Sequence, residues 1–196
     1  LGTAKVRFGK YHVDLATFRS ERYTSNNGLP EIAAGDIESD LSRRDFTINT
    51  GYILLSHDNL DKMLHVDDAI DIEMAFAHPM FHADIENGIL RVLHDRSFIE
   101  DPSRMLRAVK YSTLYDLKMD DVTQSLFNTA SKKRLITDYS RDRYRQIVLG
   151  YAKHKHGIEI LTNIYKQSLL LQVEVSEPSN TKRIQAYYDL FAEDRK

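Results

Sequence analysis

The segment at residues 98–111, which reads FIEDPSRMLRAVKY, places an acidic pair ahead of three cations spaced three residues apart. Asp is favoured at the N-cap of a helix and Pro at the first helical position, so we expect a helix that starts at Pro102 with Asp101 as its cap. At about 100° per residue, the apolar side chains share one arc of this helix: Pro102, Met105, Leu106 and Val109. The polar side chains step around the other side: Asp101, Arg104, Arg107 and Lys110. The simplest interpretation is an amphipathic helix with a solvated, basic face.

The same polar side chains are also suited to recognising a nucleobase. A carboxylate accepts a hydrogen bond from an amino group, and a guanidinium donates to a ring nitrogen or a carbonyl. Cytosine and adenine both present an amino group beside a ring-nitrogen acceptor, whereas uracil and guanine present the reverse. In this interpretation Asp101 and Arg104 accept C and A and reject U and G, while the remaining cations meet phosphates. Arg104→Ala is then expected to remove CTP and ATP binding without unfolding the protein.

A second polar cluster lies at residues 40–50, which read DLSRRDFTINT. It contains two adjacent arginines, an Asp and, four residues later, an Asn: Arg43, Arg44, Asp45 and Asn49. Taken alone, this cluster is equally well interpreted as a salt-bridged turn.

Together, the two motifs resemble the class II family of bacterial tRNA nucleotidyltransferases (CCA-adding enzymes) and poly(A) polymerases. DLSRRDFTIN followed by EDPSRMLRAVKY carries the resemblance, and VDLATFRSERY (13–23) and DIENGILRVLHD (84–95) extend it. Downstream, residues 135–172 resemble the helical RNA-binding segment of that family, with a Ser-x-Asp/Glu-Arg step at residues 140–143.

The resemblance implies a role for each matching position. Asp101 and Arg104 match the pair that selects the incoming base, and Arg107 matches a further nucleotide-contacting arginine. Lys110 stands where the family usually has another arginine, so the charge is kept but the bidentate fork is not. The 40–50 motif supplies the other nucleotide-binding matches: Arg44, Asp45 and Asn49, with Thr50 in place of the usual Ala. Asp14 sits where the family carries an acid on a strand facing the metals, which makes it a candidate catalytic carboxylate, with an exposed strand acid as the alternative.

The metal-binding motif of the family, an Asp-x-Asp pair after a glycine-rich turn, is not in these 196 residues and is expected upstream of residue 1. That pair holds the two Mg²⁺ ions that activate the primer hydroxyl and neutralise the triphosphate. Asp71 and Glu73 lack the preceding turn, and His78 and His82 lack a clear third ligand, so no metal ligand is predicted within the chain. We expect a fragment of a longer enzyme, with a degenerate paralogue as the alternative.

The implied function is template-independent addition of CMP and AMP to tRNA 3′ ends, with CTP and ATP as substrates and Mg²⁺ as cofactor. Two alternatives stay open. One is poly(A) addition by a member of the same family, and the other is an inactive paralogue that binds nucleotide or RNA.

A basic block supports an RNA partner. Residues 132–156 contain eight Lys and Arg against two Asp, although the whole chain carries a net charge of −2. Such a block is either a solvated helix face or a phosphate-contacting surface. With the resemblance, six of its residues are predicted to bind the acceptor and TΨC arm of tRNA: Lys132, Lys133, Arg134, Arg141, Arg143 and Arg145.

The remaining pattern indicates an α+β protein. Residues 3–19 alternate as strand, turn and strand, 35–56 begin with a short helical turn, 77–88 look irregular and 88–93 form a short strand. After Asp101 the pattern is helical, with breaks near 137–140, 157 and 176–180. We expect a partial nucleotidyltransferase (polymerase-beta-like) head at 1–95, neck helices at 96–137 and a helical body at 138–196. The absence of Cys fits a cytoplasmic protein, and no apolar stretch is long enough for a membrane helix.

Overall fold

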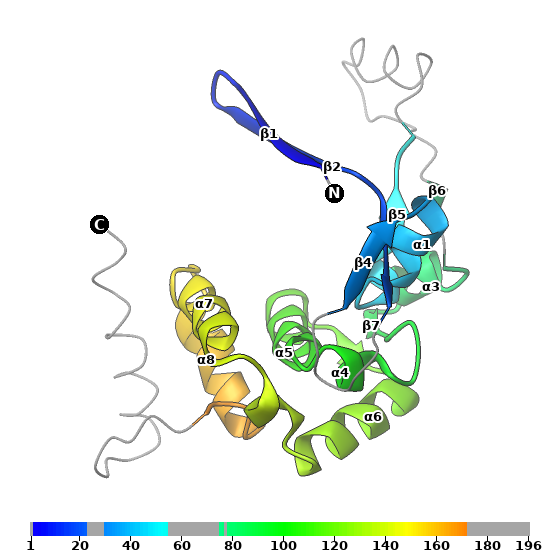
Figure 1. The fold of residues 1–196 in the computed structure, drawn as a ribbon. Helices are drawn as coiled ribbons and strands as arrows, with labels where there is room; N and C mark the ends of the chain where they lie inside the picture. The colour runs from blue at the N-terminus through cyan, green and yellow to red at the C-terminus, as the bar shows by residue number, and fades with distance from the viewer. Residues whose placement is uncertain (1, 23–29, 55–74, 77, 172–196) are drawn as a thin grey trace.

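The computed structural model describes residues 2–22, 30–54, 75–76 and 78–171. It is a mixed α+β structure, as predicted, with short two-stranded sheets in the first part of the chain and helices in the second (Figure 1). The stretches 57–73, with Asp71 and Glu73, and 176–180 lie outside the described residues. In the part of the chain that the structure describes, no helix is long and apolar enough to cross a membrane.

The predicted hairpin is present at the start of the chain and extends away from the rest of the molecule (Figure 1). Strand β1 (Thr3–Phe8) pairs antiparallel with β2 (Tyr11–Ala16). Gly9 opens the connecting turn with φ +59°, a left-handed angle that glycine adopts without a steric penalty. Alternation puts the large apolar side chains on one face, and that face is exposed: Val6, Phe8, Tyr11, Val13 and Leu15.

A second hairpin and a short helix form the next unit. Strand β3 (Arg19–Arg22) pairs antiparallel with β4 (Glu31–Ala34), and α1 (Ile37–Ser42) follows at once. Gly35 makes this sharp connection possible, because a Cβ there would lie 2.7 Å from the backbone nitrogen of Ser20. Asp36 caps α1 by accepting from the Ser39 N–H at 2.9 Å. The unit therefore packs α1 closely against the strand that carries Arg19.

Short elements continue the chain into the helical part. They are the 3₁₀ helix η1 (Thr47–Asn49), the paired strands β5 (Gly51–Tyr52) and β6 (Ala75–Phe76), and helix α3 (Phe81–Glu86). Strand β7 (Ile89–Leu90) follows, and then helix α4 (Ser97–Glu100). The prediction that 77–88 is irregular is wrong for its second half, because the apolar Phe81 is buried there and the turn around it becomes helical.

Four longer helices build the second part around a shared core. They are α5 (Ser103–Tyr115), α6 (Asp121–Lys132), α7 (Arg141–Ala152) and α8 (Gly157–Lys166), with the 3₁₀ helix η2 (Leu135–Asp138) after α6. Helix α5 is central and packs against α8. The fully buried side chains on these helices include Met105, Leu106, Phe127 and Ile160.

Strand pairing and side-chain packing both join the residues before and after position 95, where a domain boundary is expected. Strand β8 (Lys118–Met119) pairs in parallel with β7, although the sequence after Asp101 was predicted to be helical. Phe46 and Leu90, from before the boundary, belong to the same buried cluster as Phe98 and Met105. The two parts therefore share one hydrophobic core.

Candidate functional site

The two polar motifs, far apart in the sequence, line one open cavity of about 670 Å³. Six of the seven residues predicted to bind nucleotide are in its wall: Arg44, Asp45, Asn49, Asp101, Arg104 and Arg107. The wall also contains residues that were not predicted: Arg19, Glu21, Arg43, Ile48, Gly51 and Tyr111. The seventh predicted residue, Lys110, is not among the lining residues.

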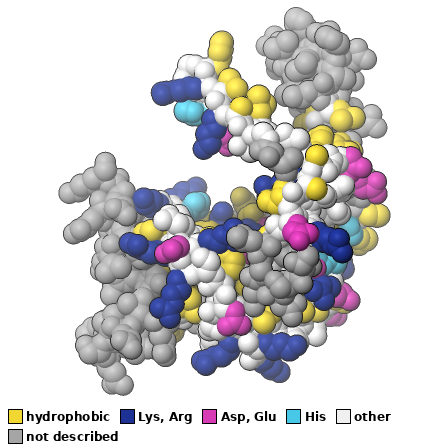
Figure 2. All heavy atoms as spheres, in the orientation of Figure 1, with side chains coloured by type: hydrophobic (Ala, Val, Ile, Leu, Met, Phe, Trp, Pro, Cys, Tyr) yellow, Lys and Arg dark blue, Asp and Glu magenta, His cyan; other side chains and the backbone are white. Residues whose placement is uncertain are grey.

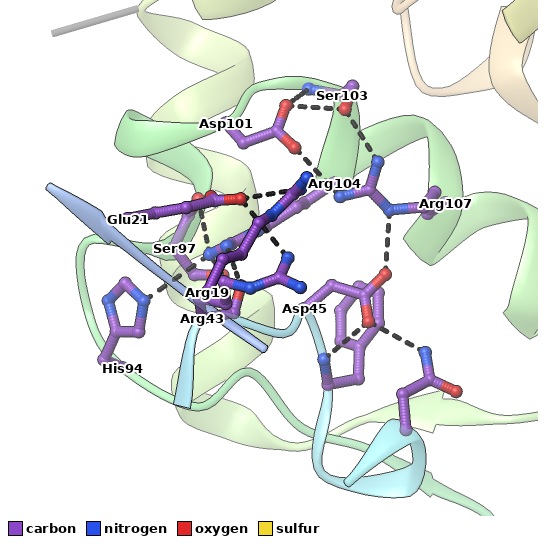
Figure 3. Close-up of polar contacts among 12 residues, drawn as sticks. Arg19, Glu21, Arg43, Asp45, His94, Ser97, Asp101, Ser103, Arg104 and Arg107 are labelled. Atoms are coloured by element: carbon purple, nitrogen blue, oxygen red, sulfur yellow. Dashed lines mark hydrogen bonds and ion pairs between the residues drawn. The ribbon is translucent and has the colours of Figure 1, made fainter. Parts of the chain in front are cut away.

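Arg107 on α5 joins the two motifs directly (Figure 3). Its Nε donates to Asp45 Oδ2 at 2.8 Å, and its Nη2 donates to Asp101 Oδ2 at 3.0 Å. Its Nη1 donates to the Ser103 hydroxyl at 2.8 Å. Burial favours the neutral form of Arg107 and so lowers its pKa. The two carboxylates favour the charged form more strongly and raise the pKa of the guanidinium above its ordinary value. One cation thus holds two carboxylates in fixed positions on the wall.

The N-cap was predicted at Asp101, but α5 begins one residue later, at Ser103, with Pro102 at the N-cap; Asp101 still binds the start of the helix. Its Oδ1 accepts from the backbone N–H of Ser103 at 3.0 Å and from the Ser103 hydroxyl at 2.5 Å. Pro102 already has helical angles, φ −58° and ψ −21°. Burial favours the neutral acid, but the charge of Arg107 and the Ser103 hydrogen bond hold the pKa of Asp101 below its ordinary value. Asp101 is therefore a carboxylate at neutral pH.

Arg104 does not lie on a solvated face, and this corrects the prediction for α5. The residue is only 3% exposed, and its guanidinium points toward Ser97 and the 40–50 motif (Figure 3). Nη1 donates to Ser97 Oγ at 2.9 Å, and Nη2 donates to the Arg43 carbonyl at 2.7 Å. Helical periodicity identified the apolar side of α5, but the polar side is covered by other elements. Arg104→Ala would leave these buried acceptors without their donor, so a binding loss in that variant would not be separable from unfolding.

The 40–50 motif folds as a tight turn that presents its polar side chains to the cavity. Asp45 Oδ1 accepts from the Phe46 N–H at 3.0 Å and from Asn49 Nδ2 at 2.8 Å. Arg44 Nη1 donates to the Asn49 carbonyl at 3.1 Å, while its side chain stays 41% exposed. Arg44 is therefore positioned by the turn and open to a ligand from solvent.

Three charged residues that sequence reasoning did not assign complete the wall. Glu21 on β3 lies 2.8 Å from Arg19 and 3.2 Å from Arg43, measured between charged nitrogen and oxygen atoms. Arg43 also pairs with Asp40. Burial favours the neutral form of Asp40, but the hydrogen bond and the charge of Arg43 outweigh it and lower the pKa of this carboxyl below its ordinary value. The i, i+2 spacing of Arg19 and Glu21 on a strand was the available signal, because it places both on one face.

Lys110 and Asp14 lie elsewhere. The ammonium of Lys110 sits over the rings of Tyr111 and Tyr151, 5.5 and 5.4 Å from their centroids, and so links α5 to α7. Asp14 is exposed on β2, opposite Lys5 in the hairpin register.

The residues that the structure describes do not form a site that fits Mg²⁺. The described residues contain no group of three or more His, Cys, Asp or Glu side chains placed to hold a metal ion. In the cavity, Asp45 and Asp101 both accept hydrogen bonds from Arg107 and are not left open for a metal ion. His78 accepts from the Met80 N–H at the turn before α3.

The six residues predicted to bind RNA are all exposed. Figure 2 shows Lys and Arg side chains over α7 and near the end of α6. A groove of about 600 Å³ connects this surface with the start of α5. Its wall contains Ser140 and Arg143 from the basic surface, and Asp101 and Arg107 from the second polar motif. The groove and the cavity share Arg19, Glu21, Asp101 and Arg107, so the basic helix α7 and the polar motifs line connected space.

This architecture, a sheet-and-helix head followed by helices that carry the second polar motif, is that of a nucleotidyltransferase head and neck. Residues 1–74 match the family described as "Poly A polymerase head domain". The A-adding tRNA nucleotidyltransferases of Aquifex aeolicus (strain VF5) and Geobacter sulfurreducens are 28% and 31% identical to the chain. Each match covers 96% of this chain, and 22% and 21% of the respective relative. The chain belongs to the class II tRNA nucleotidyltransferase and poly(A) polymerase family.

A solved structure agrees with this assignment. It is a tRNA nucleotidyltransferase complexed with a primer tRNA and an incoming ATP analog, and it matches with a TM-score of 0.69 at 27% identity. The match covers 96% of this chain and 49% of that one. The chain spans about a fifth of the length of the two curated relatives named above.

Proposed function

We propose that this protein contributes the nucleotide-selecting part of an enzyme that adds CMP and AMP to tRNA 3′ ends from CTP and ATP. One observation carries the proposal: the DLSRRDFTIN and EDPSRMLR motifs meet in one cavity, joined by the Asp45–Arg107–Asp101 bridge. The cavity offers exposed cationic charge for a triphosphate at Arg44 and fixed polar groups for a base at Asp101 and Arg104.

The chemistry of these residues is binding and orientation. Guanidinium groups bind phosphate oxygens through paired, charge-assisted hydrogen bonds, which is the contribution we assign to Arg44. The unshared lone pairs of the Asp101 carboxylate can accept from the amino group of C or A. Arg104 is among the lining residues but is only 3% exposed, and its Nε–H, which has no hydrogen-bond partner among the described residues, is buried as well. The cavity thus combines one side for phosphate and one for the base edge.

A narrower activity, addition of the terminal A alone, is supported by the two A-adding relatives. The two proposals differ in their substrates. Addition of the whole CCA end uses tRNA that lacks CCA together with both triphosphates, whereas A addition uses tRNA that ends in CC together with ATP. Incorporation assays on the enzyme to which this chain contributes, with these two tRNAs each supplied with CTP or ATP and Mg²⁺, distinguish the two activities.

Arg44→Ala is expected to weaken CTP and ATP binding by about tenfold or more, because it removes a charge-assisted contact to phosphate. The free energy of unfolding should change by no more than about 1 kcal/mol, because Arg44 is partly exposed and its buried partner Asp40 keeps its ion pair with Arg43. Calorimetric titration measures the first quantity and urea denaturation the second. Arg22→Ala, at an exposed position on β3, is the matched control and should bind like the unmodified protein. Equal affinities in the two variants would contradict the assignment of Arg44.

For the basic surface, we propose that α7 and the end of α6 contact the tRNA backbone. Replacing Arg141, Arg143 and Arg145 together by Ala should weaken tRNA binding by about tenfold or more near 0.1 M salt. The slope of log affinity against log salt should become shallower by about two to three, because each lost phosphate contact releases fewer counterions. Filter binding over a series of salt concentrations measures both quantities. An unchanged slope would show that these arginines are only a solvated helix face.

A further inference from the structure

His94 makes a contact with Arg104 that neither motif accounts for. It lies in the turn before α4, which the Ser97 N–H closes by donating to the His94 carbonyl at 3.1 Å. Its Nε2 is 3.5 Å from Arg104 Nη1, the same nitrogen that donates to Ser97 Oγ. The His94 side chain is 35% exposed, so solvent protons reach it, whereas Arg104 is buried. Figure 3 shows His94 pointing toward Arg104 from the side opposite Asp101.

The chemistry of this contact depends on the protonation state of the imidazole. A guanidinium has donors only, so Nε2 supports Arg104 when it carries a lone pair and the ring proton is on Nδ1. A protonated imidazole has two donors and no acceptor, and its charge repels the guanidinium. Glu100 on α4 offers protonated His94 another partner, because its Oε2 lies 3.5 Å from the same Nε2.

The charged groups around His94 come from three elements. Glu100 is on α4 and also pairs with Arg96, at 3.2 Å between Oε1 and Nε. Arg104 comes from α5, and Asp95 and Arg96 flank His94 in its own turn. Burial is the main cause that lowers the pKa of His94; the Arg104 and Arg96 charges add to it, while Glu100 and Asp95 oppose it. The imidazole is therefore neutral at neutral pH and becomes charged only as the pH falls below the ordinary pKa of histidine.

We propose that His94 is a positioning residue for Arg104: the neutral imidazole accepts from the guanidinium beside its hydrogen bonds to Ser97 and the Arg43 carbonyl, and protonation draws the imidazole to Glu100 and repels the guanidinium from this position. The ligand affected is the nucleobase of the incoming CTP or ATP, and this part rests on the proposed function. His94 itself does not touch the nucleotide. Its protonation makes the affinity for CTP and ATP fall as the pH drops below the ordinary pKa of histidine, about 6.5.

Two measurements on the 196-residue protein test the proposal. The first follows the Arg104 Nε–H signal by NMR from about pH 8 down through the titration of His94, to about pH 4.5, without any nucleotide. We expect this signal to shift with the same midpoint as the His94 ring signals and to stay constant in a His94→Gln variant, whose amide is uncharged. An Arg104 signal that ignores the titration of His94 would overturn the proposal, whatever the protein binds.

The second measurement is calorimetric titration with CTP at the two ends of this pH range. The unmodified protein should bind CTP about fivefold or more weakly at the lower pH, relative to a His94→Gln variant measured at the same two values. Comparing variants cancels protonation of CTP itself, and His12→Gln, at an exposed position on β2, is the control that should keep the full pH dependence. Equal pH dependence in the His94→Gln variant and the unmodified protein would contradict the proposal.

The two readouts also separate the proposal from the function on which it rests. If no CTP or ATP binds at any pH, the proposed function fails, while the NMR titration still decides whether His94 positions Arg104. Should His94→Gln fail to fold, a His94→Asn variant, also uncharged, is used for the same comparison.

Discussion

Replacing Arg107 by Met is expected to lower the free energy of unfolding by about 3 kcal/mol or more and to abolish nucleotide binding. Arg107 forms ion pairs with two largely buried carboxylates, and removing one partner of a buried ion pair leaves the other charge uncompensated. The side chains of Asp45 and Asp101 are only 11% and 24% exposed, so water replaces the guanidinium poorly. Urea denaturation measures the loss, and Arg145→Met, at an exposed position on α7, is the matched control.

The pH dependence of this loss identifies its cause. In the unmodified protein the pKa of Asp101 is held below its ordinary value, so its contribution to stability is present above that value and is lost as the pH falls through the folded-state pKa. Without Arg107, burial dominates and raises the pKa, and a protonated acid no longer needs a cation. The difference in unfolding free energy between the two proteins should therefore narrow as the pH falls from about 6 to about 3. A difference that stays constant would mean that Arg107 acts through packing.

Phe46→Ala is expected to destabilise the protein by about 3–5 kcal/mol, the usual range for a fully buried Phe. Phe46 has no exposed surface, and its ring packs edge-on against Tyr111 at 5.8 Å between centroids. The contact with Tyr111 on α5 fixes the 40–50 motif to the helical part, and the Phe46 backbone also forms a bridge to Val92, between β7 and α4. The control is Phe8→Ala on the hairpin, where Phe8 is 79% exposed and the expected change is within about 0.5 kcal/mol. Equal losses in the two variants would contradict this description of the core.

Local patterns were sufficient to predict several elements. Alternating residues on either side of Gly9 predicted the first hairpin, because a strand exposes alternate side chains to opposite faces. Asp101 and Pro102 predicted the start of α5 to within one residue, because a cap acts through neighbouring backbone groups. Capping and strand alternation act between residues a few positions apart, so they can be recognised in the sequence without knowledge of the fold.

Contacts between distant segments were not predictable in the same way. Asp45 and Arg107 are 62 residues apart, and neither periodicity nor spacing indicates that they meet. The family resemblance grouped their motifs, but the bridge itself became visible only in three dimensions. The burial of Arg104 was missed because a helical wheel shows which side is apolar, not what covers the polar side. His94 was missed because its contact with Arg104, ten residues further along the chain, leaves no pattern in the sequence.

The central place of α5 has a consequence for changing which nucleotide is selected. Arg104 and Arg107 are separated by about 4.5 Å along one helix, and the opposite side of that helix is locked into the shared core. Sliding or turning the helix would disturb both arginines at once and would unpack Met105 and Leu106 as well. Base preference is therefore tied to the fixed position of α5, whereas Arg44, which stands on a separate turn, can be exchanged to alter the phosphate contact alone. The helix keeps a constant spacing between its two arginines, and the turn that carries Arg44 can be changed without moving them.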